Sequence, residues 1–203
     1  MKNSIILIVL SFMALSCSKN EGIPETPKDQ LPAITTTGAN TAGCVINGKV
    51  IIPKNTINST SGFTSYGMRY VVGPNFGQSN FNDYFSLTFA NLKDKGKSYS
   101  IYIHLNELTM GEGNYTVGQS NSLYFIDGPN NPQIIVRETF DNVSGKTFIS
   151  GANSGTIIIT RFDYANKIYS GTFNCTLYNK DNSLETISVN EGRFDFNGLT
   201  LNQ

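Results

Sequence analysis

The chain has 203 residues and a formal net charge of zero, with 15 Lys and Arg residues against 15 Asp and Glu residues. This length suits one domain with short extensions. A hydrophobic content of 39% without any run of like charges argues against a disordered chain. The charge balance also argues against a nucleic acid partner, because binding to phosphate backbones needs a basic surface.

The N-terminus predicts export. Lys2 precedes an apolar run at residues 5–15, IILIVLSFMAL, which would span roughly 16 Å as a helix. The run is too short for a stable membrane span but has the length of a signal-peptide core. A buried N-terminal helix is the alternative, although residues 18–40 show no apolar periodicity that would continue it. We therefore predict a signal peptide over residues 1–16.

The end of this segment, Ala14-Leu15-Ser16 followed by Cys17, resembles a bacterial lipobox. The resemblance implies that the signal peptide is removed and that Cys17 becomes a first residue carrying acyl chains such as palmitate. An ordinary secretory signal followed by an unrelated cysteine is the alternative. Each buried CH₂ of an acyl chain contributes ~0.8 kcal/mol to membrane binding, so two or three chains anchor a protein firmly. The implied location is the outer membrane of the cell envelope, on the periplasmic face or at the cell surface.

Residues 17–40 have the composition of a lipid-anchored flexible tether. Pro24, Pro27 and Pro32 interrupt the segment, and three threonines follow without a core-forming pattern. Such a tether would hold a folded domain at residues 41–203 on the order of 50 Å at most above the lipid surface.

Short apolar runs and turn residues alternate through this domain. Residues 44–53, CVINGKVIIP, predict a hairpin, because Asn47-Gly48 suits a type I′ turn and a proline ends the second strand. A second hairpin is predicted at residues 84–91 and 99–105, where apolar and polar residues alternate with period two.

The last third of the chain predicts a third hairpin at residues 155–163 and 168–178, then a strand at 185–196 in which Gly192 indicates a bulge. Weaker strands are predicted at residues 66–72, 114–117, 123–126, 134–139 and 146–150. No stretch has apolar residues repeating with the period of an amphipathic helix. The pattern predicts an all-β fold, an antiparallel β-sandwich of about ten short strands. A closed β-barrel is the alternative.

Four short motifs lie near the two ends of the domain: residues 43–48 (GCVING), 160–163 (TRFD), 168–173 (IYSGTF) and 191–195 (EGRFD). Together they resemble a family of uncharacterised lipoproteins from Bacteroidota that is known as a domain of unknown function. Residues 55–151 resemble the family only in general character and contribute no motif. The resemblance implies an envelope location and a β-rich fold, and it implies no activity.

Two of these motifs carry charged residues two positions apart, Arg161 with Asp163 and Arg193 with Asp195. Residues i and i+2 share one face of a strand. We predict that these four residues form structural ion pairs or cap turns, and that they do not catalyse a reaction.

The residues that usually carry chemistry are few. His104 is the only histidine, and a hydrolase triad needs a histidine between a nucleophile and an acid, so we predict a solvated strand histidine and no catalytic site. Cys44 and Cys175 are the thiols that remain if Cys17 is acylated; they form either a disulfide in an oxidising compartment or two buried free thiols. This set is too small for a usual zinc site, and no acidic repeat suggests calcium, so we predict no metal and no cofactor.

Tyr84, Tyr102 and His104 are predicted on the wet face of the second hairpin, where exposed rings could stack on sugars or contact a protein. The leading hypothesis is a non-enzymatic envelope lipoprotein, held at the membrane by its N-terminal lipid, that binds an unknown protein or glycan ligand. A structural or accessory subunit of an outer-membrane assembly is the second hypothesis. A hydrolase that uses His104 is the third.

Overall fold

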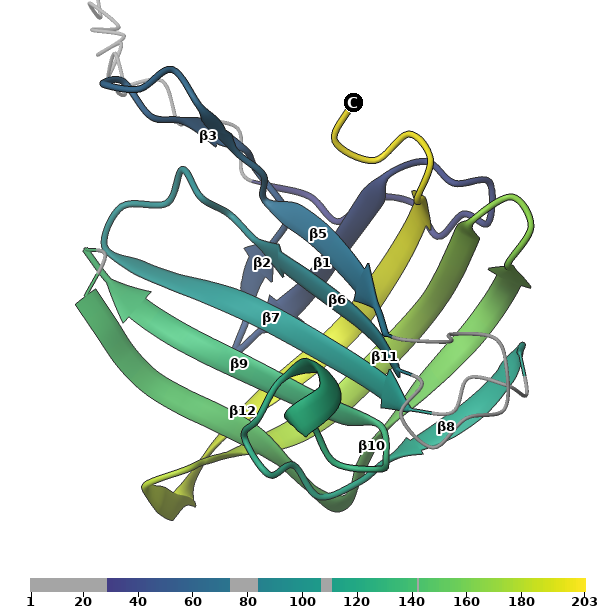
Figure 1. Cartoon of the computed structure of the whole chain (residues 1–203). Coiled ribbons are helices and arrows are strands. Elements are labelled where there is room, and N and C mark those ends of the chain that lie inside the picture. The colour runs from purple at the N-terminus through teal and green to yellow at the C-terminus, as the bar shows by residue number, and fades with distance from the viewer. Residues whose placement is uncertain (1–28, 74–83, 107–110, 142) are drawn as a thin grey trace, which may run out of the picture.

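Antiparallel pairing organises most of the chain that the computed structural model describes, residues 29–73, 84–106, 111–141 and 143–203 (Figure 1). One sheet contains ten strands and another contains two. The strands are β1 (Thr41–Ile46), β2 (Lys49–Ile51), β3 (Thr56–Ile57), β4 (Thr64–Ser65), β5 (Met68–Val72), β6 (Tyr84–Ala90), β7 (Lys97–Asn106), β8 (Gly113–Val117), β9 (Gln133–Phe140), β10 (Val143–Asp163), β11 (Ile168–Asn179) and β12 (Asn182–Asn197). The prediction of an all-β, antiparallel fold is confirmed.

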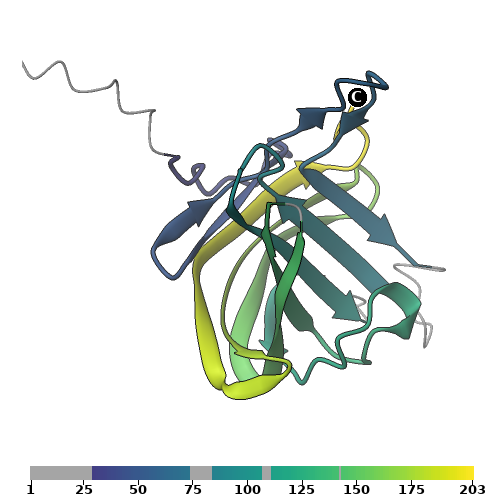
Figure 2. The same ribbon diagram turned by 90° about the vertical axis from the view of Figure 1, so that its left-hand side faces the viewer.

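The large sheet curls into a half-barrel (Figures 1 and 2). Its order is β2-β1-β12-β11-β10-β9-β7-β6-β5, and the long β10 pairs with β9 along its first half and with β8 along its second half. The two halves of the sheet meet across one core. The Phe85 ring lies 5.9 Å from the Phe196 ring, and the Phe89 ring lies 6.3 Å from the Phe173 ring. The two layers expected of a sandwich are therefore halves of a single curved sheet.

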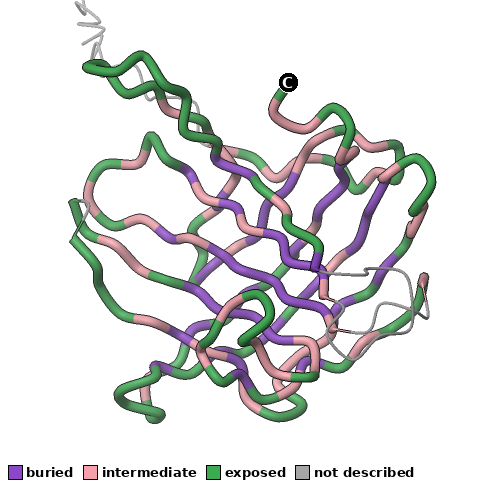
Figure 3. Tube along the Cα trace, viewed as in Figure 1, coloured by how far each residue is buried: buried purple, intermediate pink, exposed green. Residues whose placement is uncertain are grey.

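Side-chain alternation produces the core. Leu87 on β6 and Ile101 and Ile103 on β7 are fully buried, which confirms the inward face of the second hairpin. Buried residues run along the middle of the strands in Figure 3. A cavity between core rings, including those of Phe162 and Tyr169, has a volume of about 10 Å³, the size of a single water molecule. This part of the core has no room for a ligand.

Backbone geometry confirms the predicted first turn and the bulge. Asn47 and Gly48 have φ angles of 47° and 81°, as a type I′ turn requires. On β12 the register against β11 shifts beside Glu191, which has a φ of 51°. A Cβ atom at Gly192 would lie 2.5 Å from the Phe173 ring, so only glycine lets the ring pack there.

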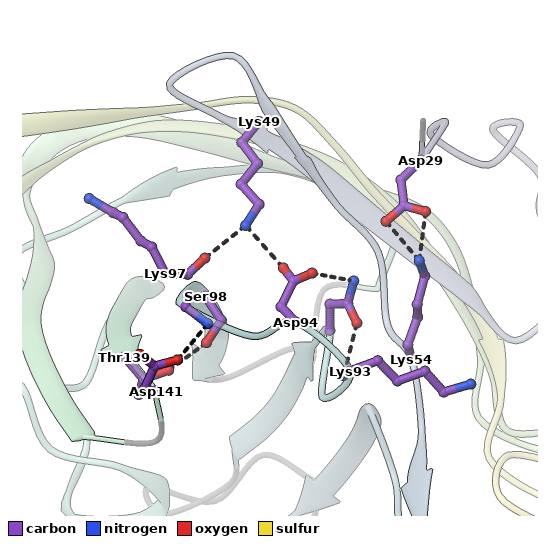
Figure 4. Close-up of polar contacts among 11 residues, drawn as sticks. Asp29, Lys49, Lys54, Lys93, Asp94, Lys97, Ser98, Thr139 and Asp141 are labelled. Carbon is purple, nitrogen blue, oxygen red and sulfur yellow. Dashed lines mark hydrogen bonds and ion pairs between the residues drawn. The ribbon is translucent and has the colours of Figure 1, made fainter. Parts of the chain in front are cut away.

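The two edges of the curled sheet are joined beside the β1–β2 hairpin. After β2 the chain crosses to the end of β6, where the N–H of Lys54 donates to the carbonyl of Ala90 at 3.1 Å. Figure 4 shows Lys49 reaching the turn between β6 and β7. Its ammonium lies 3.0 Å from the Asp94 carboxylate and donates to the Lys97 carbonyl at 2.8 Å. These contacts hold the first hairpin against the second.

The prediction of a flexible tether is wrong for residues 29–40, which pack on the sheet as an N-terminal strap. The Asp195 carboxylate on β12 accepts a hydrogen bond from the Thr35 hydroxyl at 2.6 Å. It also accepts the backbone N–H groups of Thr37, Gly38 and Ala39 at 3.0, 2.8 and 3.1 Å. The strap is ordered because its donors converge on one acceptor.

Asp195 is almost fully buried, and its fifth donor is the Ser170 hydroxyl on β11, at 2.7 Å. Burial alone would raise the pKa of Asp195, but the hydrogen bonds outweigh burial and hold this pKa below its ordinary value. The carboxylate is therefore charged at neutral pH, and five donors compensate for its lost hydration.

Two arginines bind carbonyl groups of the strap. Arg161 donates to the Thr36 carbonyl at 2.7 Å, and Arg193 donates to the Pro32 carbonyl at 3.2 Å. Arg161 also pairs with Asp163 at 2.9 Å, which confirms the first predicted ion pair.

Arg193 and Asp195 do not pair with each other. The Arg193 guanidinium lies 3.4 Å from the Glu191 carboxylate, and Asp195 is occupied by the strap. Three charged residues of the two motifs, Arg161, Arg193 and Asp195, therefore fix the N-terminal segment.

Replacing Asp195 with Ala should detach the strap and lower the free energy of unfolding by on the order of 2–4 kcal/mol, because five donors lose their acceptor. Urea denaturation of both proteins measures this difference. Asp163→Ala removes an exposed ion pair with Arg161 and two hydrogen bonds from Asn166, and it should have a smaller effect because these groups can bond to water instead. Equal destabilisation by the two substitutions would contradict the assigned role of Asp195.

Candidate functional site

The outer face of β6 and β7 is buried, so the prediction of a wet face is wrong. Ser86, Tyr102 and His104 are 2%, 3% and 1% exposed, and Tyr84 at the end of β6 is half-buried. The strand register places Ser86 directly opposite His104. The Ser86–His104 pairing follows from the register of the hairpin, whereas a segment elsewhere in the chain buries these two side chains.

That segment is a compact loop at residues 118–132, the cover loop. Its ends are joined by a hydrogen bond from the Gly118 N–H to the Pro132 carbonyl at 2.8 Å. It contains the 3₁₀ turn η2 (Phe125–Asp127) where a weak strand was predicted at residues 123–126, so that prediction is wrong. In Figure 1 this turn lies in front of β7 and β9. The cover loop therefore shields the polar face of the second hairpin from water.

A neutral hydrogen-bonded cluster joins the cover loop to the sheet. Ser86 Oγ lies 2.8 Å from the Tyr102 hydroxyl and 3.2 Å from His104 Nδ1. The Tyr102 hydroxyl accepts the N–H of Phe125 at 2.8 Å. Burial raises the pKa of Tyr102 and lowers that of His104 to about 4, an effect that a hydrogen bond to the Pro129 carbonyl only partly opposes. Both side chains are therefore uncharged at neutral pH.

Phe125 has an unusual backbone conformation for a bulky residue, with a φ of 55°. Such conformations cost about 1–3 kcal/mol and are concentrated at functional sites such as ligand clamps. The hydrogen bond to Tyr102 holds the Phe125 backbone in place, while the residue remains 42% exposed. A buried polar cluster thus presents an aromatic ring at the surface.

Phe125 also forms one wall of a cleft of about 310 Å³ on the outer face of β5 and β6. Apolar, hydroxyl and charged side chains share the remaining lining, which consists of Arg69, Tyr70, Val71, Ser86, Thr88, Leu201 and Asn202. Arg69 is exposed and forms no ion pair with any residue in the described ranges. Largely apolar walls with a few polar groups are typical of small-ligand sites.

Sequence reasoning found His104 and Tyr102 but missed the residues that line this cleft. The register of the second hairpin would have paired Ser86 with His104. No sequence signal brings Phe125 or Arg69 to the same place, because the cover loop and β5 are remote from each other in the chain.

The Ser86–His104 pair has the spacing of a nucleophile and a base, but its surroundings suit a structural role. A histidine with a pKa of about 4 is a weak base at neutral pH. Within the described residues no carboxylate bonds to its ring, whose partners are Ser86, Tyr102 and the Pro129 carbonyl. Those residues also contain no group of three or more His, Cys, Asp or Glu side chains placed to hold a metal ion.

Of the two alternatives for Cys44 and Cys175, the structure shows two buried free thiols and no disulfide. Cys44 lies on β1 and Cys175 on β11, with β12 between them. Two strand spacings amount to roughly 10 Å, beyond the approximately 7 Å that a disulfide spans. Burial raises the pKa of both thiols, to about 11 for Cys175, so they behave as small apolar side chains.

Cys17, the predicted acylation site, lies outside the described residues. Those residues include no helix with the length and hydrophobicity of a membrane span. Comparisons of the chain with protein-family models, curated proteins and solved structures found no match. The lipoprotein resemblance stays a prediction, and any role for the cleft has to be argued from its own geometry.

Acidic pH should destabilise the protein through His104. Its folded pKa of about 4 lies below the ordinary value of about 6.5. The unfolded chain therefore binds the proton first, and stability falls as the pH drops below 6.5, by on the order of 2 kcal/mol at pH 5. Urea denaturation at pH 7 and pH 5 should show a smaller loss for His104→Gln than for the wild type. Parallel losses would contradict a buried neutral histidine, because the carboxylates titrate in both proteins.

Proposed function

We propose that this protein is a lipid-anchored protein of the cell envelope whose β domain is a non-enzymatic binding module. The apolar N-terminal run and the lipobox-like residues before Cys17 support acylation and an outer-membrane location. The weakly basic, fully buried His104 supports a binding role over a hydrolytic one.

The observation that carries the binding role is the strained Phe125 beside the cleft. A ligand with a flat apolar face would stack on the half-exposed ring, and the Thr88 hydroxyl would meet its polar groups. Arg69 would attract an anionic substituent. A cleft of about 310 Å³ is near the small end of ligand sites. These features suit one ring of a glycan, preferably one that carries an acidic group.

The test is a panel of neutral and acidic glycans, titrated against the full mature protein in detergent micelles. Phe125→Ala should weaken binding by about tenfold, because the stacking surface is lost. Arg69→Gln should weaken only the binding of acidic glycans. Leu184→Ala removes an exposed apolar side chain of β12 outside the cleft and should change nothing. Absence of binding across the panel, or equal binding by Phe125→Ala, would refute the proposal.

A further inference from the structure

The small sheet β3–β4 forms an arm at residues 55–66 that projects from the curled sheet (Figures 1 and 3). Its sequence, NTINSTSGFTSY, contains no charged residue. Ile57 and Phe63 are 67% and 76% exposed, and Tyr66 at the base is also exposed. An uncharged projection with large exposed apolar side chains is unusual on a surface that meets only water.

The arm has a defined shape. Asn58 and Phe63 are joined by a backbone hydrogen bond at 2.9 Å, and the Asn58 side chain accepts the N–H groups of Thr60 and Ser61 at 2.9 and 3.0 Å. At the base, the Gly67 N–H donates to Asn55 Oδ1 at 2.8 Å. The exposed Phe63 is therefore held at the end of a hydrogen-bonded ribbon.

The apolar side chains lie on both faces of this ribbon. Ile57 is paired with Thr64, whereas Phe63 lies opposite Asn58, one position along. Neighbouring positions of a strand point to opposite faces. A flat protein surface would cover only one of these side chains, whereas a medium that surrounds the tip covers both. The lipid–water interface is such a medium, and hydroxyl and amide side chains such as those of the arm suit its polar layer.

The position of the strap places the arm near the predicted anchor. Asp29, where the described chain begins, pairs with Lys54 at 2.6 Å, directly before the arm (Figure 4). Cys17 precedes Asp29 by twelve residues, which span about 40 Å at most. The arm extends about 20 Å from its base to its tip. An acylated Cys17 would therefore hold the bilayer within reach of the tip.

We propose that the arm enters the lipid–water interface beside the acylated Cys17 and forms a second contact with the bilayer, with Phe63 inserted most deeply. This inference rests on the lipid anchor of the proposed function. Since the arm carries no charge, its insertion should depend little on the charge of the lipid headgroups.

The test measures lipid contact at the tip. Ser61→Cys is labelled with an environment-sensitive fluorophore in the acylated protein, which is reconstituted in phosphatidylcholine vesicles containing spin-labelled lipid. The buried Cys44 and Cys175 should not react in the folded protein. Asp181→Cys, in the exposed β11–β12 turn, carries the control label. Strong quenching at residue 61 and weak quenching at residue 181 are expected. Equal quenching would overturn the proposal, as would a shielded label at residue 61 that lipid does not quench, which would indicate a protein partner.

Matched variants separate the arm from the anchor. Ile57→Ser combined with Phe63→Ser should reduce insertion about tenfold or more, because the apolar side chains are lost. Leu184→Ser, at an even more exposed apolar site on β12, should leave it unchanged. Cys17→Ala should abolish acyl labelling and release the protein from the membrane fraction. Retained acylation in that variant would refute the anchor, whereas an acylated wild type without quenching at residue 61 would refute only the arm.

Discussion

The hydrogen bonds of one buried carboxylate, Asp195, make the N-terminal strap part of the fold. Its donors at residues 35–39 lie up to 160 positions away in the chain. Four of its five donors come from the strap, so this charge can be buried without a cost of several kcal/mol only when the strap is in place. The strap and the end of β12 must therefore become ordered together. The path of the chain toward its predicted anchor follows from this constraint, and so does its exit beside the β3–β4 arm.

The proposed binding cleft depends on a second buried polar group, His104. Asp195 is buried as a charged group, whereas His104 is buried as a neutral one. Asp195 has five donors and stays charged, whereas His104 has no opposite charge among its described partners and stays neutral. Neutrality lets the Ser86–Tyr102–His104 cluster lie under the cover loop without a counter-ion. Through Tyr102, this cluster fixes Phe125 in a strained conformation at the rim of the cleft. Two distant segments, the strap and the cover loop, are thus positioned by polar side chains on the outer surface of the sheet.

Features that depend on residues close together in the chain could be predicted from the sequence, whereas features that depend on remote residues could not. The hairpins, the Asn47-Gly48 turn and the bulge beside Gly192 were predictable, because alternation and turn chemistry are local. The polar face around His104 was correctly identified as polar but wrongly expected to be wet, since a loop from elsewhere covers it. The strand order could not be predicted from the sequence either. It places β12 between the strands of Cys44 and Cys175. The role of Asp195 was missed for the same reason, because no local pattern reveals a partner in the strap.

Hydrogen–deuterium exchange at the amides of Thr37, Gly38 and Ala39 tests the central claim most directly. These N–H groups donate to Asp195 and belong to no strand, so their protection reports on the strap alone. The account predicts exchange in the wild type as slow as at the paired amides of β12, and fast exchange in Asp195→Ala. Exchange in the wild type at the rate of an unstructured chain would contradict it.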